Sequence, residues 1–315
     1  MTVRLPLRPL ALASLITNAL LVVTGGAVRL TGSGLGCPTW PRCTAASYTT
    51  TAEMGVHGAI EFGNRLLGVL LGLIALATFI AALLERPRRR SQARLSFVLG
   101  LGVVAQGVVG GVTVLTGLNP WIVGAHFVIS MVMTAGAYVL WQRTAEPDGP
   151  RVPLVPVPLR TLGRLTTVVS AAVILVGVVV TGSGPHAGDE TTPRNGFDPT
   201  NISQVHADLV FLLIGLSVAL WFALRAVSAP PAAVRAAGVL VLVELGQGLI
   251  GFVQYFTHLP VLLVGAHMLG ATLVWIATLA AVRALGEAQP AVPEFPPADS
   301  RDTMASAIRS AEPSA

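Results

Sequence analysis

The chain has 315 residues, of which 53% are hydrophobic and only 11% are charged. A soluble globular chain carries about twice that charged fraction, so the composition excludes an ordinary soluble domain. The net charge of +5 does not indicate nucleic-acid binding, because all twenty basic residues are arginines whose positions follow a membrane topology.

Apolar runs of roughly 20 residues, the length that crosses a bilayer, recur along most of the chain. They predict eight transmembrane helices, at Leu10–Leu30, His57–Leu84, Leu95–Thr116, Trp121–Trp141, Leu165–Thr181, Ile202–Leu224, Ala236–Phe256 and Val261–Val282. The first run follows Arg4 and Arg8, as the apolar part of a signal peptide would. However, it is too long and no small-residue cleavage site follows it, so we expect a retained first helix.

The arginines predict the orientation of these helices. When the connecting segments are assigned alternately to the two sides, sixteen arginines share one side, and only Arg29, Arg42, Arg65 and Arg194 fall elsewhere. Arginine-rich loops face the cytoplasm. We therefore expect a multi-pass protein of the cell membrane with both termini cytoplasmic. The segment 285–315, rich in Pro, Ala, Ser and charge, is expected to be a disordered cytoplasmic tail.

Both cysteines, Cys37 and Cys43, follow the first predicted helix, on the outer side. Disulfides persist in that compartment, and five intervening residues form a closable ring, although Pro38 and Pro41 restrict its geometry. A metal site is the alternative, but two thiolates alone do not complete a coordination shell. A disulfide is the preferred interpretation.

Short blocks recur in the same order in the two parts of the chain, which indicates an internal repeat. The matched blocks are Gln106–Gly110 with Gln247–Gly251, Val123–His126 with Val264–His267, and Thr31–Gly34 with Thr181–Gly184. The glutamine and the histidine are 20 residues apart in both parts. Because four helices return the chain to its starting side, the repeats are parallel, related by an axis along the membrane normal. This predicts an all-α membrane protein of two four-helix bundles, 1–142 and 164–284, joined by a cytoplasmic linker, 143–163.

Three histidines lie near the outer ends of predicted helices, where such residues usually face the bundle interior. His126 opens the fourth helix, His267 opens the eighth, and His206 lies early in the sixth. Two histidines on facing helices of a bundle can hold an iron porphyrin between them. The alternative is that each histidine only hydrogen-bonds a neighbouring helix. The duplicated placement favours haem ligation by His206 and His267.

The first half departs from this pattern. His206 lies 61 residues before His267, and counting back a similar distance of 62 residues from His126 reaches Asn64, where the repeat predicts a histidine. His57 lies seven residues earlier on about the same helical face, but two turns away, or roughly 10 Å along the axis.

Glu61 is the strongest single candidate for a catalytic residue, since a carboxylate at membrane depth is costly and commonly functional. It precedes Arg65 by one helical turn, so a structural ion pair is the alternative. Both readings can hold, because Arg65 can equally bind a haem propionate. The repeat places Ser203 at the position of Glu61 in the second half, so the halves differ chemically.

A second buried acid, Glu244, lies one turn before Gln247 in the seventh helix. It is expected either to hydrogen-bond across the bundle or to belong to a proton path. Gln106 and Gln247 are expected to pack between helices, with their amides bonded to neighbours.

Three sequence features together resemble the heme A synthase family: the segment Gly25–Pro38, the segment Glu61–Arg65 and the two Gly-Ala-His motifs. The resemblance covers Leu10 to Val282. It implies oxidation of the C8 methyl group of haem O to a formyl group, giving haem A for terminal oxidases.

The resemblance also implies a role for each half. The C-terminal half would hold haem b between His206 and His267. The N-terminal half would bind the substrate haem O, with Glu61 essential and the pair Cys37 and Cys43 in an outer loop.

The family pattern commonly has a histidine where this chain has Asn64. An amide is a poor iron ligand beside imidazole, so we expect His126 to hold the substrate iron with its opposite axial position open. The alternative is that His57 approaches that position. Glu61 would accept a proton, or stabilise positive charge on the reacting carbon.

Two rival functions remain as alternatives. A di-haem b-type electron-transfer protein linked to quinone would be expected to have histidine pairs in both halves, and Asn64 counts against it. A transporter is the second rival, since parallel repeats are common among transporters. That reading gives the matched histidines and the cysteine pair no role. The sequence leaves open the electron acceptor and whether a haem O synthase delivers the substrate.

Overall fold

The structure, a computed structural model, describes residues 6–290. Eight long helices account for most of it: α1 Leu7–Leu30, α2 Gly55–Leu84, α3 Arg90–Leu115, α4 Pro120–Arg143, α5 Val157–Ser183, α6 Pro199–Ala226, α7 Pro231–Phe256 and α8 Val261–Arg283. All eight are long and apolar enough to cross a membrane. The eight predicted helices are therefore confirmed, and the chain is a multi-pass membrane protein.

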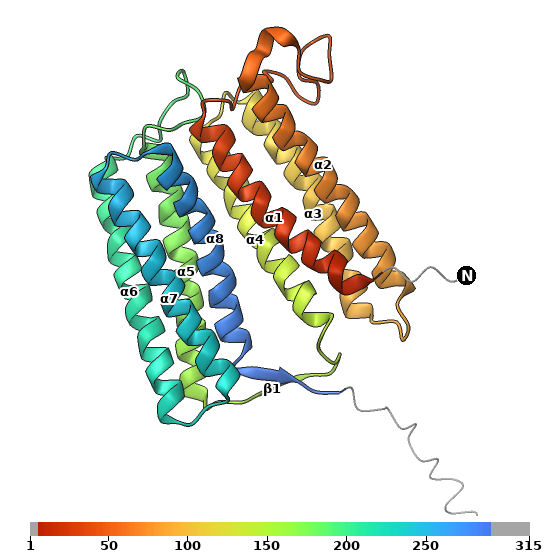
Figure 1. Cartoon of the computed structure of the whole chain (residues 1–315), viewed down its shortest axis with the longest axis vertical. Helices are drawn as coiled ribbons and strands as arrows, with labels where there is room; N and C mark the ends of the chain where they lie inside the picture. Colours follow the sequence, from red (N-terminus) through yellow and green to blue (C-terminus); the bar gives the residue numbers. More distant parts are fainter. Residues whose placement is uncertain (1–5, 291–315) are drawn as a thin grey trace, which may run out of the picture.

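The helices form two groups of four that lie side by side (Figure 1). In the first group, consecutive helices contact each other and α1 closes the ring against α4. The second group repeats this order, with α5 closing against α8. The groups meet where α1 and α4 contact α8, and where α4 contacts α5. Each half therefore has the same order of neighbours, as the repeat predicts.

Several helices begin earlier than hydropathy predicts, because polar residues and prolines form their first turns. The Asn119 side chain caps α4 by accepting from the Trp121 N–H at 3.0 Å. Asp198 caps α6 in the same way, accepting from the Asn201 N–H at 2.8 Å. A proline follows each cap, where its missing N–H costs nothing.

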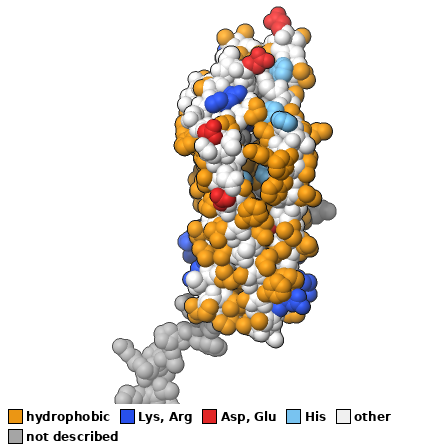
Figure 2. All heavy atoms as spheres, turned by 90° about the vertical axis from the view of Figure 1, so that its left-hand side faces the viewer, with side chains coloured by type: hydrophobic (Ala, Val, Ile, Leu, Met, Phe, Trp, Pro, Cys, Tyr) orange, Lys and Arg blue, Asp and Glu red, His pale blue; other side chains and the backbone are white. Residues whose placement is uncertain are grey.

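Small polar side chains fill the helix interfaces, and large apolar ones face outward. Thr134, Thr166, Thr272 and Thr278 have no exposed surface. Their hydroxyls donate to carbonyl groups one turn back in their own helices. Figure 2 shows that hydrophobic side chains cover most of the lower half of one face, where lipid would lie. This distribution is typical of membrane bundles, whose helices approach closely at small residues.

A short antiparallel strand pair adds to the helices. Strand β1, Arg151–Pro153, pairs with β2, Gly286–Ala288, just after α8. The sequence predicts a linker over 143–163 and a disordered tail from 285. Instead, α5 begins at Val157 and the first residues of that tail are ordered by pairing with β1. Each strand is only three residues long and is held by backbone bonds to a distant segment, so its sequence shows no alternating hydrophobic pattern. The strand pair could therefore not be predicted from composition. The rest of the expected tail, 291–315, lies outside the described residues.

The two halves are joined by polar contacts at both ends. At the end that carries the α1–α2 loop, Arg29 of α1 donates to the carbonyl oxygens of His186 at 2.6 Å and Thr181 at 2.7 Å. At the other end, Glu146 accepts from Arg151 at 2.9 Å and from Arg283 at the end of α8. The repeat places Val179 at the position of Arg29, so the second half has no arginine at the equivalent position.

We predict that Arg29→Ala destabilises the protein by about 1.5–3 kcal/mol, the contribution of one hydrogen bond from a charged donor, because the second of its two bonds is exposed to solvent. Thermal unfolding in detergent should show a lower midpoint. Arg164→Ala is the control, since Arg164 is exposed on α5, and its midpoint should match wild type. Equal midpoints for both variants would show that Arg29 does not hold the halves together.

Candidate functional site

The C-terminal half brings two predicted ligands close together. His206 on α6 and His267 on α8 have ring centroids 6.4 Å apart, with the ring planes at 68°. Metal–imidazole bonds of about 2 Å, with each ring centre about 1 Å behind its nitrogen, would place two rings that share one iron about 6 Å apart. The observed separation matches that spacing, and the donor set is the one that six-coordinate haem uses.

Glycines leave the space that these rings occupy. A Cβ atom on Gly177 of α5 would lie 3.0 Å from the His206 ring, and one on Gly251 of α7 would lie 3.1 Å from the His267 ring. Both contacts are tighter than ordinary packing, so a side chain at either position would push a ring. The glycines therefore help to set the positions of both imidazoles.

Each half anchors its outer histidine through a glutamine 20 residues earlier. Gln247 donates to the His267 carbonyl oxygen at 2.8 Å, and its Nε2 lies 2.9 Å from His267 Nδ1. Gln106 donates to the His126 carbonyl oxygen at 3.1 Å. The expected packing of both glutamines between helices is confirmed, and the repeated motifs make equivalent contacts.

In the N-terminal half, the His126 ring lies against Gly110, whose Cβ position would be 3.4 Å from His126 Cε1. His126 Nδ1 is buried and has no hydrogen-bond partner among the described residues. A buried, unpaired imidazole next to a glycine fits a ligand site for a haem iron. Gly110 and Gly251 are repeat partners, so the two histidines have equivalent surroundings.

The other two candidates of this half bond to α1 and the loop after it. The Asn64 Oδ1 accepts from the Thr24 hydroxyl of α1 at 2.7 Å. His57 Nδ1 lies 2.9 Å from the Ser33 hydroxyl, in the Thr-Gly-Ser-Gly block that follows α1. The structure therefore places His57 against the outer loop. The repeated block was a signal that could have identified Ser33, but nothing in the sequence singled out Thr24.

Glu61 is buried and bonds in two directions. Its Oε1 accepts from Arg65 at 2.6 Å, so the expected ion pair is confirmed. Its Oε2 accepts from the Cys37 backbone N–H at 2.6 Å, which the sequence did not predict. Oε2 thus bonds α2 to the cysteine loop, whereas Oε1 bonds Arg65 one turn along the same helix.

Arg65 extends the same contact. Besides Glu61, its guanidinium donates to the carbonyl oxygens of Cys37 at 3.0 Å, Thr39 at 3.1 Å and Arg42 at 3.3 Å. Cys37 and Cys43 form a disulfide, as predicted. Arg65 therefore binds the disulfide ring, and its donors are used there rather than by a separate anionic group.

Glu244 lies at the centre of α7, almost fully buried, and its Oε1 accepts from the Ser217 hydroxyl of α6 at 2.8 Å. The bond across the bundle, one of the two expected roles, is confirmed.

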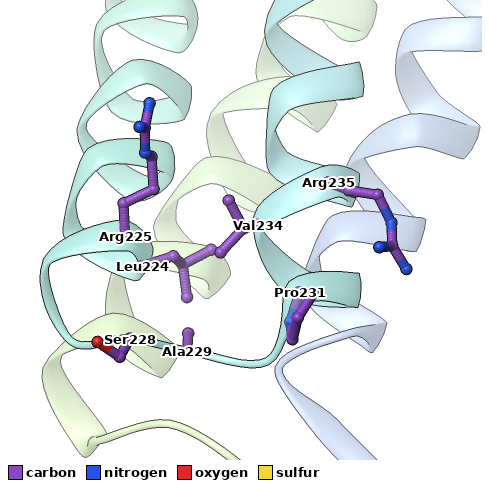
Figure 3. A pocket seen from close by; sticks show the side chains of 7 residues that line it. All are labelled: Leu224, Arg225, Ser228, Ala229, Pro231, Val234 and Arg235. Carbon is purple, nitrogen blue, oxygen red and sulfur yellow. The ribbon is translucent and has the colours of Figure 1, made fainter.

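Two surface hollows lie away from these residues. One, of about 360 Å³, lies at the α6–α7 turn (Figure 3), at the opposite end of α6 from His206. The other, of about 660 Å³, lies beside β2 and the end of α8. Neither is lined by a predicted site residue.

Together these features define a class: an eight-helix membrane protein that presents facing histidines in one half and a buried histidine beside an anchored disulfide loop in the other. The chain belongs to the COX15-CtaA family of cytochrome oxidase assembly proteins, which matches residues 8–279.

Its relatives include proteins named heme A synthase. That of Methylobacterium radiotolerans is 28% identical, over 88% of this chain and 90% of that protein. That of Methylobacterium sp. strain 4-46 is 28% identical, over 81% and 85%. That of Alkalihalophilus pseudofirmus is 31% identical over a shorter region, 44% of this chain and 48% of that protein.

Proposed function

We propose that this chain is a heme A synthase, which oxidises the C8 methyl group of haem O to the formyl group of haem A. The observation that carries the proposal is the difference between the halves of a chain from this family. The C-terminal half has a histidine pair, whereas the N-terminal half has the single buried histidine His126 and also contains Glu61 and the disulfide loop. A resident cofactor suits the C-terminal half, and a substrate suits the N-terminal half.

In the C-terminal half, His206 and His267 would hold haem b. When bound, this haem supplies one-electron transfer chemistry. Gln247 orients His267 by bonding both its ring and its carbonyl oxygen. Gly177 and Gly251 keep the space beside the rings free of side chains.

In the N-terminal half, His126 would bind the iron of the substrate haem O. Asn64 is a poor ligand by its chemistry, and its amide oxygen is bonded to Thr24. The opposite axial position is then open, with His57 as the alternative ligand. His57 bonds Ser33 through Nδ1, so Nε2 is the nitrogen through which it would serve as that alternative ligand.

Converting a methyl to a formyl group adds one oxygen and removes two hydrogens, so protons and electrons must leave the reacting carbon. Glu61 is the carboxylate available in this half to accept a proton or to stabilise developing positive charge. Its bonds to Arg65 and Cys37 support a second role, which is to hold the disulfide loop in place. Substitutions that separate these roles are described in the Discussion.

The proposal places the protein in the cell membrane with both termini in the cytoplasm. The end that carries Arg86, Arg90, Arg143 and Arg283 is the arginine-rich one, and arginine-rich loops stay inside. Haem O would come from a haem O synthase. The disulfide loop would then lie on the outer side, where a disulfide persists.

Co-expression with a haem O synthase, in a host without its own haem A, tests the function. Chromatography of the extracted haems should show haem A or its hydroxylated intermediate only when this chain is present. A folded, membrane-inserted protein that yields haem O alone would contradict the proposal.

A further inference from the structure

We propose that Trp40 is a substrate-binding residue that forms one wall of the N-terminal haem site and contacts the porphyrin of haem O. The inference rests on the proposed function, because it names the residue that contacts the substrate of that reaction. Trp40 lies inside the disulfide ring between Cys37 and Cys43, on the loop that follows α1.

The first observation is the position of the indole on α3. A Cβ atom on Gly111 would lie 2.3 Å from Trp40 Cδ2, 2.5 Å from Cε2 and 2.6 Å from Cγ. Three central atoms of the indole at similar distances mean that the flat face of the ring lies against the helix backbone. Only a glycine leaves room for this contact, so the absence of a side chain at Gly111 allows the indole to pack on the helix.

The second observation concerns Gly110, the residue next to Gly111. Gly110, the preceding residue of α3, contacts the His126 ring. The indole and the proposed iron ligand therefore lie against adjacent residues of one helix. Trp40 remains 38% exposed, so part of its ring is free to contact a bound molecule. Aromatic side chains bind flat aromatic ligands by stacking or edge contacts.

The repeat shows that this arrangement is specific to the first half. Gly111 corresponds to Phe252, since Gly110 corresponds to Gly251. In the second half the aromatic ring is therefore carried by the helix itself, where Phe252 packs on Phe211 with ring centroids 6.2 Å apart. In the first half the helix has no side chain at this position and a loop supplies the ring. An aromatic side chain on a helix, such as Phe252, suits a site for a resident haem. An aromatic side chain on a loop, such as Trp40, suits a site whose substrate must bind and leave.

Glu61 and Arg65 hold this loop, and therefore Trp40, through the backbone. Arg65 donates to the carbonyl oxygens on both sides of Pro38, those of Cys37 and Thr39, and Glu61 accepts from the Cys37 N–H. The buried ion pair thus acts on the substrate through the position of the indole.

The test is a titration of purified protein with haem O in nanodiscs, followed by the Soret band, with haem b content measured on the same samples. Trp40→Ala should raise the Kd for haem O about tenfold, because the variant loses the aromatic contact with the porphyrin. Trp40→Phe should retain most of the affinity. Haem b content should stay at the wild-type level. Trp121→Ala is the matched control, since Trp121 is exposed near the start of α4 and packs on Phe197.

A double-mutant cycle separates the contact from a general disturbance of the loop. Gly111→Ala adds the Cβ that collides with the indole, so it should weaken haem O binding while the disulfide remains formed. In the Trp40→Ala background the same change should have no further effect.

Unchanged haem O affinity in Trp40→Ala, or additive effects of the two changes, would overturn the proposal. If wild-type protein does not bind haem O at all, the proposed function fails instead.

Discussion

Replacing His267 with alanine is expected to remove haem b from the purified protein, lowering the haem b content at least tenfold. The His267 ring faces His206 at 6.4 Å between centroids, and alanine offers no ligand in its place. His206→Ala should have the same effect, because in the proposed site each histidine would supply one of the two iron ligands. The measurement is the pyridine haemochrome spectrum per mole of protein, with gel filtration to confirm that the variants remain folded.

His258→Asn is the control for these variants. His258 is exposed in the α7–α8 turn and has a positive φ of 63°, which asparagine tolerates. Its haem b content should equal that of wild type. If His267→Ala retained a full complement of six-coordinate haem b, the pair would not be the ligands of a resident haem.

Glu61→Ala is expected to lower haem A production at least tenfold while haem b content stays unchanged. The variant loses the ion pair with Arg65 and the bond to the Cys37 N–H, two charge-assisted bonds of about 1.5–3 kcal/mol each. The disulfide loop should then be less firmly held, and chemical reduction of the disulfide should be faster. Chromatography of extracted haems measures the first effect, and thiol labelling over time measures the second.

Further variants separate the two roles of Glu61. Glu61→Gln keeps an oxygen for the Cys37 N–H but cannot accept a proton as a carboxylate does. If loop positioning dominates, the glutamine variant should keep much of the activity and Arg65→Ala should be as defective as Glu61→Ala. If proton transfer dominates, the glutamine variant should be as inactive as the alanine variant.

Glu53→Ala is the control for a lost acid near the same loop, because Glu53 is exposed in the short helix η1, Ala52–Met54. Wild-type haem A production in both Glu61→Ala and Arg65→Ala would exclude both roles.

Much of the fold follows from features that extend over many residues. Apolar runs long enough to cross a membrane gave the eight helices, and the repeated Gln–His spacing predicted contacts that occur in both halves. The i, i+4 spacing of one helical turn also predicted the ion pair between Glu61 and Arg65. These predictions succeed because hydropathy and helical periodicity determine them locally.

The parts that sequence could not reveal depend on segments that fold back from a distance. The loop after α1 has no period, so nothing indicated that Cys37 would bond Glu61 or that Trp40 would lie on Gly111. Arg29 is an exception to the charge pattern, and nothing in the sequence indicates that it joins the halves. Strand β2 was assigned to a disordered tail for the same reason, because its partner β1 lies before α5.

The central claim is that one half keeps a six-coordinate haem whereas the other holds its haem through His126 alone. Electron paramagnetic resonance of air-oxidised wild-type protein, loaded with haem b and haem O, tests it most directly. We predict one bis-histidine signal, lost in His206→Ala and unchanged in His57→Ala, together with a second haem of different coordination. Two bis-histidine signals in wild type, one of them lost in His57→Ala, would contradict this account.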